Sequence, residues 1–408
     1  MMDVGSLFFD LELSKLATDR DASLFVEDMS AHRGRLEAAI AGRRILITGG
    51  AGSIGASTAE LLLEFRPAAA HVIDIAENAL VELVRDLRSR AKPLVSGELR
   101  LLPIDYGSAA TERLLQSEPP YDFVLHFAAH KHVRSEKDVP SLLQMLDTNV
   151  VKMRRFLLWL ARYGHGERCF AVSTDKAANP TSLMGASKRL MEHVLFTSGG
   201  LATATSARFA NVAFSNGSLL QGFLFRLARR QPLAVPREVR RYFVSAREAA
   251  EICLLGALVA PTDHIVFPRL DAAEHLRLLV DIAQDLLKRL DLRPSLYDDE
   301  TKACAAVSDE LKRGHYPVLV TPLDTSGEKP YEEFVATDEV MTEVGFSALQ
   351  AVRYVPSPGP LEEVLSFIER AVTNADLVVT KSDITRRLAS VVPGFHHVEA
   401  GRSLDERA

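Results

Sequence analysis

The chain has 408 residues, of which 47% are hydrophobic and 25% are charged, and its formal net charge is −6. This composition is typical of a soluble globular enzyme with one large α/β unit or two domains. The negative charge provides no basic field for nucleic acid or anionic lipid, so we expect neither as a partner. Cys169, Cys253 and Cys304 are far apart and odd in number, which argues against a disulfide framework and for a reducing compartment.

Membrane insertion and secretion are also disfavoured. No apolar run approaches the ~18 residues that cross a bilayer, and the longest candidate, 249–260, contains Glu251. The first five residues lack the basic start and the long apolar stretch of a signal peptide. We therefore expect a cytoplasmic protein without a membrane span.

Residues 1–40 are charge-rich with helical spacing, and we interpret them as an N-terminal helical extension outside the main sheet. Over 41–212, mostly apolar strand-like runs alternate with amphipathic helical runs, which predicts a parallel sheet covered on both faces. The predicted strands are 44–48, 71–75, 99–104, 123–127, 169–173 and 204–209, and the predicted helices are 54–65, 78–90, 109–117, 142–162 and 184–196. The expected fold class is α/β, a Rossmann-like doubly wound parallel sheet.

The second half of the chain is more irregular. We interpret 213–375 as a smaller substrate-binding lobe that is partly interleaved with the sheet, and 376–408 as a C-terminal tail. The predicted helices of these two parts are 216–230, 246–258, 275–289, 360–371 and 382–389.

A glycine loop follows the first strand and opens the next helix, which is the order that a dinucleotide site requires. Gly49, Gly52 and Gly55 form this loop together with Ser53 and Ile54. Glycine permits the tight turn and the close approach of a pyrophosphate, and the exposed amides of the helix start hold the phosphate charge. The alternative is a glycine turn that only packs helix against strand.

Residues at the ends of the next three strands are further candidates for cofactor contacts. Asp74 indicates NAD rather than NADP, because a carboxylate pairs with free ribose hydroxyls and repels a 2′-phosphate; a simple strand-end cap is the alternative. Asp105 and Tyr106 stand where the adenine is often met, although an ordinary loop aspartate explains Asp105 equally well. Ala128 and Ala129 are small enough to let the cofactor diphosphate and ribose pass.

Residues 173–188 are the most informative stretch of the chain. Asp175 and Lys176 put an acid beside a base at the end of a predicted parallel strand, where ligands bind in this fold. Lys188 follows on the next helix, one turn after Met184. A solvated ion pair is the alternative interpretation of Asp175 and Lys176.

These segments resemble the extended short-chain dehydrogenase/reductases. The resemblance is specifically to the nucleotide-sugar 4,6-dehydratases of the CapD-like polysaccharide-biosynthesis group, which act on UDP-N-acetylglucosamine. It runs from about residue 41 to 345 and is clearest at 48–55, 128–133 and 173–188, with support from 148–150, 208–212, 241–243 and 327–333.

The resemblance implies a reaction in which NAD takes a hydride from carbon 4 of the sugar and returns it to carbon 6. Lys176 then removes the carbon 5 proton, Asp175 is the acid at carbon 6, and Lys188 holds the nicotinamide ribose. Most short-chain dehydrogenases have a tyrosine where this chain has Met184, which cannot exchange a proton, so a simple alcohol dehydrogenase or reductase is disfavoured. Thr174, Asp175 and a water are the candidates for the acceptor of the carbon 4 hydroxyl proton.

The resemblance also implies a set of substrate-binding residues. Arg241 lies where the family binds the nucleotide, and Lys131 is close enough to the cofactor segment to reach the substrate. Relatives tend to have Arg-Pro before Gly327, whereas this chain has Asp-Thr-Ser at 324–326, so the nucleotide and the sugar stay open. The full set of substrate candidates is Lys131, His132, Asn211, Arg241 and Glu328.

Several alternatives remain at this point. No cysteine pair accompanies the histidines 126, 130 and 132, and the family needs no metal, so we expect no metal site. An epimerase shares the fold and cofactor but usually keeps the tyrosine, and a non-enzymatic NAD-binding regulator would not explain Asp175, Lys176 and Lys188.

Apolar residues at helical spacing near both ends, such as Leu13 and Ile384, must pack on the core or on another subunit, and we expect a homo-oligomer.

Overall fold

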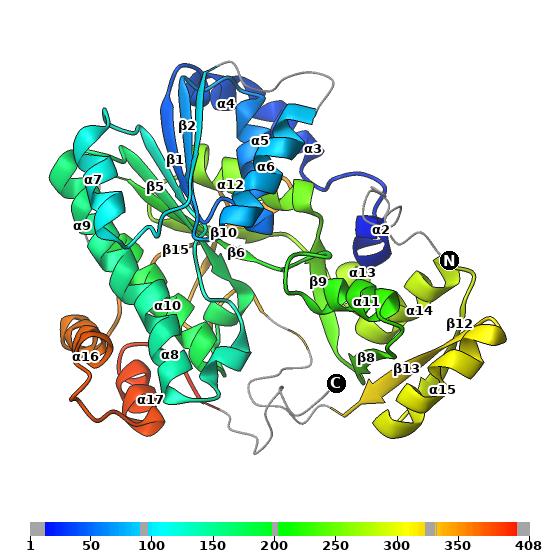
Figure 1. Cartoon of the computed structure of the whole chain (residues 1–408). Helices are drawn as coiled ribbons and strands as arrows, with labels where there is room; N and C mark the ends of the chain where they lie inside the picture. The colour runs from blue at the N-terminus through cyan, green and yellow to red at the C-terminus, as the bar shows by residue number, and fades with distance from the viewer. Residues whose placement is uncertain (1–12, 90–96, 198–202, 323–330, 332, 398–408) are drawn as a thin grey trace.

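The computed structural model describes residues 13–89, 97–197, 203–322, 331 and 333–397. The strands of its main sheet are β1 Arg44–Thr48, β2 Ala69–Ile73, β3 Glu98–Leu102, β4 Phe123–His126, β5 Arg168–Thr174, β6 Ala204–Phe209, β10 His264–Pro268, β14 Met341–Thr342 and β15 Leu349–Arg353. Among the described residues they form one nine-stranded sheet in the order β14-β15-β10-β6-β5-β4-β1-β2-β3 (Figure 1). The strands from β3 to β10 are parallel and β15 is antiparallel to β10, which confirms the Rossmann-like α/β class.

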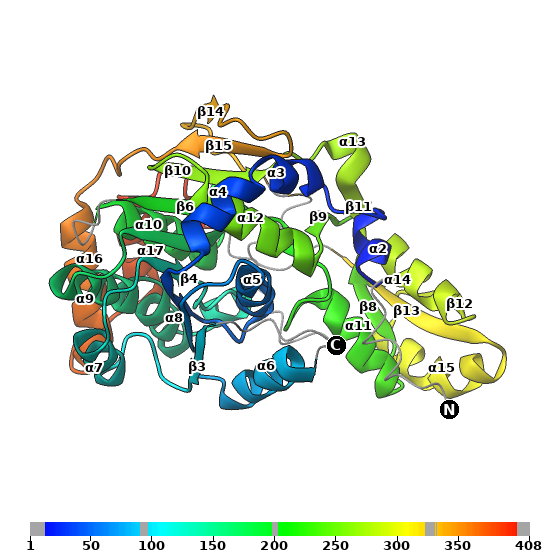
Figure 2. The same cartoon turned by 90° about the horizontal axis from the view of Figure 1, so that it is seen from above.

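Both faces of the sheet are buried, as β1 illustrates. Its side chains alternate, with Ile45 and Ile47 in one apolar cluster and Leu46 in the other, and all three are fully buried. A strand that is apolar on both faces is stable only with helices on both sides. These helices are α5 Ser53–Leu63, α6 Glu77–Ser89 and α12 Ala246–Leu258 on the first face, and α7 Ala109–Ser117, α8 Val139–Leu146, α9 Lys152–Tyr163 and α10 Leu183–Thr197 on the second (Figure 2).

The predicted helix over 142–162 is interrupted in the structure. α8 begins at Val139, where the Asp138 carboxylate accepts a hydrogen bond from the backbone N–H of Ser141. It is followed by a π-helical turn, Asp147–Val151, before α9 begins at Lys152. Such turns are found frequently at functional sites, and this one lies in the segment 148–150 on which the family resemblance draws.

The strand order reverses next to β1, which pairs with β2 on one side and with β4 on the other. In doubly wound sheets a crevice opens at this point, beyond the carboxyl ends of the strands. The glycine loop, Ala129 and Asp175 each follow one of these strand ends, so the topology places them at the same edge of the sheet.

A lobe built from two small sheets covers this edge. Its strands are β7 Asn211–Val212, β9 Arg240–Val244 and β11 Leu276–Leu278 in one sheet, and β8 Leu233–Pro236, β12 Arg293–Tyr297 and β13 His315–Thr321 in the other. Its helices are α11 Leu219–Ala228, α13 Ala272–His275, α14 Leu279–Arg289 and α15 Glu300–Lys312. The prediction of a helix over 275–289 is wrong at its start, because residues 276–278 pair with β9 as a strand. Strands β8, β9, β12 and β13 and helix α15 lie outside the predicted elements.

The first and last helices that the structure describes pack on the core of the chain. α2 Leu13–Thr18, α3 Val26–Ala31 and α4 Arg33–Ile40 precede the sheet, and α16 Leu361–Thr373 and α17 Lys381–Ala389 follow it. Leu13 is buried in the core of the lobe, while Ile384 and Leu388 are buried against the helices of the second face. Leu13, Ile384 and Leu388 are therefore covered within one chain.

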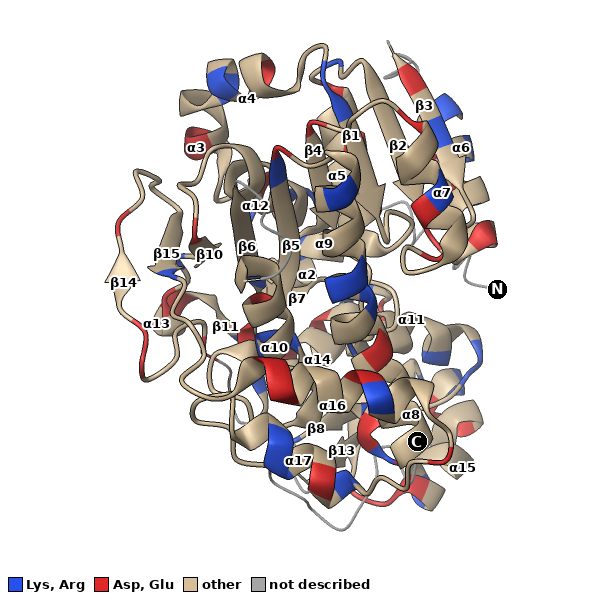
Figure 3. Cartoon of the chain, turned by 90° about the vertical axis from the view of Figure 1, so that its left-hand side faces the viewer, with Lys and Arg blue, Asp and Glu red and all other residues tan. Residues whose placement is uncertain are grey.

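Figure 3 marks the positions of Lys and Arg in blue and those of Asp and Glu in red along the ribbon. Acidic and basic residues are interspersed along the helices that face the viewer there. Within the part of the chain that the structure describes, no helix is both long and apolar enough to cross a membrane.

Candidate functional site

A cavity of about 340 Å³ opens at the carboxyl edge of the main sheet. The glycine loop, the ends of β4, β5 and β6 and residues 215–218 form its walls. It brings together most of the cofactor and catalytic residues predicted from the sequence and three of the substrate candidates: Gly49, Gly52, Ser53, Ile54, Gly55, Ala129, Thr174, Asp175, Lys176, Met184 and Lys188, with Lys131, His132 and Asn211.

The glycine loop has the shape of a phosphate cradle. Gly49 has φ +69°, and a Cβ there would lie 2.4 Å from the backbone nitrogen of Ala128. A Cβ on Gly55 would lie 2.5 Å from the carbonyl oxygen of Gly49. Gly52 differs, because a Cβ there would lie 3.4 Å from its nearest neighbour, the carbonyl oxygen of Gly49. Gly52 is also the N-cap residue of α5, so no cap side chain accepts from the first helix amides. Protein packing thus explains Gly49 and Gly55, whereas Gly52 leaves room and free helix amides for an anionic ligand.

Asp74 orders the same loop. One carboxylate oxygen accepts a hydrogen bond from the N–H of Ala51 at 3.0 Å, and the other accepts from the N–H of Ala76 at 2.9 Å. The side chain is therefore a strand-end cap in this structure, and it holds its negative charge beside the turn that a dinucleotide would contact.

The residues after β3 do not line the cavity. Asp105 accepts a hydrogen bond from Gly107 N–H at 2.8 Å and pairs with Lys152 at 2.5 Å. Tyr106 is 5% exposed, packs edge-on against His126, and donates its hydroxyl hydrogen to the carbonyl of Thr148. The aromatic ring is thus part of the core and offers no side-chain surface for an adenine.

Asp175 and Lys176 directly follow β5 and are hydrogen bonded to each other. Lys176 Nζ donates to Asp175 Oδ1 at 2.9 Å, and the same oxygen accepts from Thr174 Oγ1 at 2.8 Å and from Lys176 N–H at 2.9 Å. Asp175 is 3% exposed, whereas a quarter of the Lys176 side chain is exposed. The arrangement holds a carboxyl, an amine and a hydroxyl together at the floor of the cavity.

Met184 and Lys188 lie on α10, which forms the adjacent wall. Met184 is 3% exposed, and its backbone N–H donates to the buried Glu136 carboxylate at 2.8 Å. Lys188 Nζ donates to the carbonyl of Val172 at 2.7 Å. Burial lowers the pKa of Lys188 to about 8, so this amine is less strongly held as a cation than an exposed lysine.

A second cavity of about 660 Å³ lies between this floor and the lobe, and it shares His132, Asn211, Gly217 and Ser218 with the first cavity. Arg241, a substrate candidate from the resemblance, is among its lining residues. Lys131 Nζ reaches across to the carbonyl of Asn216 at 2.7 Å, so it bridges the two parts of the chain. Glu328 lies outside the described residues.

Sequence reasoning missed several residues of this second cavity. Arg134, Phe225 and Arg226 line it, and they add two cations and an exposed ring to Arg241. The only sequence signal for Arg134 was its position directly after 128–133, and that for Phe225 and Arg226 was their place on the helix after Ser218.

The role of Asn149 was missed as well. Its side chain makes paired hydrogen bonds with the backbone of His130, at 2.8 and 2.9 Å, and so holds the segment after β4 in place.

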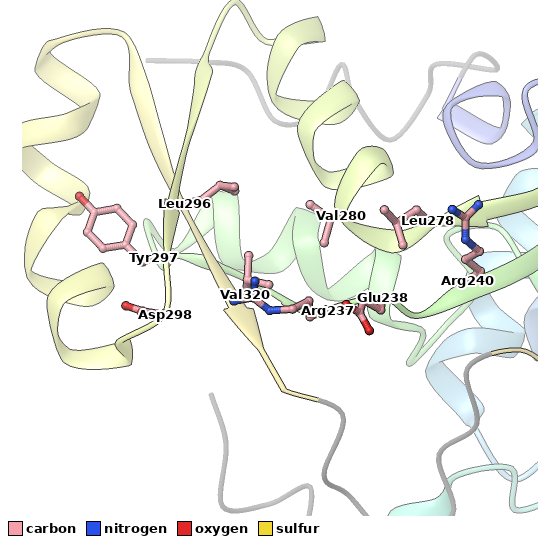
Figure 4. Close-up of a pocket in the computed structure, with 9 residues that line it drawn as sticks. All are labelled: Arg237, Glu238, Arg240, Leu278, Val280, Leu296, Tyr297, Asp298 and Val320. Carbon is pink, nitrogen blue, oxygen red and sulfur yellow. The ribbon is translucent and has the colours of Figure 1, made fainter.

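The third cavity, of about 610 Å³, lies within the lobe (Figure 4). Arg237, Glu238, Leu296 and Val320 are among its lining residues, and no strand of the main sheet contributes to it. Because it contains none of the predicted site residues, we do not assign the chemistry there. Among the described residues no group of three or more His, Cys, Asp or Glu side chains is arranged to hold a metal ion.

Comparison with known proteins agrees with the fold. Residues 45–353 match the family described as "Polysaccharide biosynthesis protein". The chain belongs to this family, which is the polysaccharide-biosynthesis group of the extended short-chain dehydrogenase/reductases. The match begins at β1 and ends at β15, so it includes the glycine loop, both cavities and every described candidate residue.

Two curated relatives illustrate the similarity. The first is "Uncharacterized membrane protein MJ1061" of Methanocaldococcus jannaschii, which is 30% identical over 73% of this chain and 82% of its own length. The second is a UDP-N-acetylglucosamine 4,6-dehydratase (inverting) of Campylobacter jejuni, 27% identical over 61% of this chain and 73% of its own. Other curated relatives are longer, and the matched part spans about half of their length or less.

Solved structures show the same fold at low sequence identity. Pen from Bacillus thuringiensis has a TM-score of 0.60 at 20% identity, covering 77% of this chain and 87% of Pen. DesIV, a dTDP-glucose 4,6-dehydratase from Streptomyces venezuelae solved with NAD and TYD bound, has a TM-score of 0.53 at 20% identity, covering 72% of this chain and 88% of DesIV.

Proposed function

We propose that this chain is an NAD-dependent nucleotide-sugar 4,6-dehydratase. Its substrate is UDP-N-acetylglucosamine or a related nucleotide hexosamine, and its product is a 4-keto-6-deoxy sugar nucleotide for polysaccharide or glycan biosynthesis. The observation on which the proposal depends is the Asp175–Lys176 pair on the floor of the cavity, with Met184 in the place of a tyrosine. Removal of water requires a base at carbon 5 and an acid at carbon 6, whereas redox at carbon 4 alone requires only an acceptor for the hydroxyl proton.

The residues present fit the cofactor. The glycine loop and the start of α5 would hold its diphosphate, Asp74 would face the adenosine ribose, and Lys188 would bind the nicotinamide ribose. When bound, the nicotinamide supplies hydride chemistry, taking a hydride from carbon 4 and returning it to carbon 6. We favour NAD because a 2′-phosphate would be repelled by Asp74.

The side chains at the end of β5 then divide the proton transfers. The Thr174 hydroxyl donates to Asp175 and both residues line the cavity, so the proton of the carbon 4 hydroxyl would pass through Thr174 or a water to the Asp175 carboxylate. Asp175 gives that proton to the carbon 6 hydroxyl, which leaves as water. Lys176 removes the carbon 5 proton and returns it after the hydride reaches carbon 6. Every proton taken up is therefore given back within one turnover.

The nucleotide half of the substrate would occupy the second cavity. Arg134, Arg226 and Arg241 supply the positive charge there that a diphosphate requires, in a chain whose net charge is negative. Because this chain lacks the arginine that relatives have before Gly327, Arg134 and Arg226 are our candidates for the missing cation.

Isotope transfer tests the proposal directly. UDP-N-acetylglucosamine labelled with deuterium at carbon 4 should lose one water, and the deuterium should appear at carbon 6 of the same molecule. An unchanged mass with inverted configuration at carbon 4 would instead establish the epimerase. No turnover of any UDP- or GDP-hexosamine would favour the NAD-binding regulator.

A further inference from the structure

Glu192 is a buried carboxylate that the proposed reaction does not use. It lies on α10 one turn after Lys188 and is fully buried. Its Oε1 accepts hydrogen bonds from Ser173 Oγ at 2.6 Å and from Arg208 Nε at 3.0 Å, and its Oε2 accepts from Arg208 Nη2 at 2.8 Å. Ser173 and Arg208 are register partners on β5 and β6. One carboxylate therefore ties a helix to two neighbouring strands.

Two more charged side chains complete this buried cluster. Arg208 donates to both oxygens of Glu339, at 2.5 and 2.8 Å, and Arg189 pairs with Glu192 and Glu339. The four side chains are at most 2% exposed, and their charges sum to zero. Burial raises the pKa of Glu192, but Arg208 and Arg189 outweigh it and hold the value below its usual range. The carboxylate is thus charged and firmly held.

The cluster contacts both elements that supply reacting groups. Ser173 is followed directly by Thr174, Asp175 and Lys176, while Lys188 precedes Glu192 on the same face of α10. The loop after Lys176 is fixed to the segment that carries Glu339 as well. Asn179 donates to Glu333 at 3.0 Å and accepts from Thr337 N–H at 3.2 Å. The cluster therefore joins the end of β5, the face of α10 and the segment that carries Glu339 at one place.

We infer that Glu192 is a positioning residue for the proposed reaction. Through Ser173 and Arg208 it sets the end of β5, with Asp175 and Lys176, against the face of α10 that carries Met184 and Lys188. A displacement of ~1 Å of reacting groups can cost up to ~100-fold in rate, so a brace at this point affects turnover more than binding. As far as turnover is concerned, the inference rests on the proposed function.

The sharpest test removes a single hydroxyl. Ser173→Ala deletes the hydrogen bond to Glu192 and leaves the four charges in place. Ser206→Ala is the matched control, because Ser206 is fully buried on β6 and donates to the carbonyl of Ala171 on β5 at 2.7 Å, away from the reacting groups. Ser173→Thr keeps a hydroxyl at the same position and serves as the conservative rescue.

We expect Ser173→Ala to lower kcat ~10-fold with little change in KM, as for misplaced reacting groups. Ser173→Ala and Ser206→Ala should lower Tm by similar amounts, but Ser206→Ala should leave kcat nearly unchanged. Ser173→Thr should restore most of kcat. Glu192→Gln should lower kcat further. Because it leaves two buried arginines with one carboxylate and endangers folding, the serine variants decide the test.

Crystal structures of Ser173→Ala and Ser206→Ala provide a readout that does not need turnover. Asp175 should shift relative to Lys188 in the first variant and not in the second. If the wild-type chain dehydrates no nucleotide sugar, the proposed function fails. The position of Asp175 relative to Lys188 in the two variant structures then tests the positioning role by itself. Equal effects of the two alanine variants on kcat, or an unmoved Asp175, would overturn the inference.

Discussion

At the residue scale, the site concentrates three hydrogen bonds on one oxygen of Asp175. Two come from Lys176 and one from Thr174, at 2.8 to 2.9 Å. These three bonds order the carboxyl, the amine and the hydroxyl before substrate arrives. The same arrangement gives a route for the proton that the missing tyrosine would otherwise take, because the Thr174 hydroxyl already contacts the acid.

The first prediction concerns this pair. Lys176→Ala and Asp175→Asn should each reduce turnover at least ~100-fold, which is the scale of a lost general acid or base. NAD affinity should survive, since neither side chain is expected to hold the dinucleotide. The rate of water loss by mass spectrometry and NAD titration by calorimetry measure the two effects. Near-normal turnover in both variants would remove the pair from the mechanism.

The second prediction concerns Asp74. Asp74→Ala removes the acceptor for the N–H groups of Ala51 and Ala76 and the charge that would face a 2′-phosphate. NAD should bind ~10-fold more weakly, and its advantage over NADP should shrink, because hydrogen bonds to a charged group are worth ~1.5–3 kcal/mol. Titration with both dinucleotides measures this. Glu82→Ala, on the exposed surface of α6, is the control. Weaker binding with an unchanged preference would leave Asp74 as a cap alone.

At the scale of elements, the C-terminal helix behaves as part of the core. α17 begins with a capping box formed by Thr380 and Asp383, and it buries Ile384 and Leu388 under the second face of the sheet. A nine-residue helix is marginal on its own in water, so its formation depends on this packing.

The third prediction follows from that packing. Leu388 is fully buried, and Leu388→Ala should lower the free energy of unfolding by ~2–5 kcal/mol through lost burial and the cavity left behind. Val378→Ala is the control, because Val378 is 89% exposed and its truncation should cost no more than ~0.5 kcal/mol. Urea denaturation measures both. An equal, small effect would mean that α17 is not held on the core in solution.

At the scale of the whole molecule, buried histidines make stability depend on pH. Burial, with a smaller contribution from Lys188, lowers the pKa of His126 to about 3. Burial, with a contribution from Arg189, lowers the pKa of His193 to about 4. An unfolded histidine has a pKa of ~6.5, so below that pH the unfolded chain binds more protons than the folded one. Stability is therefore present above pH 6.5 and is lost as the pH falls toward 4.

The fourth prediction puts a size on this effect. When the pH falls from 7 to 5, each of the two histidines should lower the free energy of unfolding by about 2 kcal/mol, because proton binding is linked to unfolding. Urea unfolding at the two pH values measures the difference, and His193→Asn should remove part of it. Stability that is equal at pH 5 and pH 7 would contradict the prediction.

The fifth prediction is a homo-oligomer. Leu13, Ile384 and Leu388, which suggested it, are buried within one chain, so these three side chains are not the subunit contact. Light scattering on the intact protein at micromolar concentration measures the mass, and a monomeric mass would contradict the oligomer. The cytoplasmic location stays a prediction as well, to be tested by cell fractionation.

The sequence alone predicted six strands of the parallel sheet and the residues on the floor of the site, whereas β10, β14 and β15 lie outside the predicted elements. β1 and β6 begin and end where apolar runs predict them, and the glycine loop and the stretch 173–188 identified the residues that meet in the first cavity. These features follow from local patterns, because hydrophobic periodicity and glycine spacing are properties of neighbouring residues, and parallel strands necessarily end at one edge.

Only the tertiary structure decided the rest, because those features depend on residues far apart in the chain. Tyr106 turns into the core where it meets His126, and residues 276–278 become a strand because β9 lies beside them. The bond between Arg208 and Glu339 spans 131 positions, so no local pattern could indicate the cluster around Glu192. Burial decides which charged residues pair and which line a cavity, and burial exists only once distant segments have packed together.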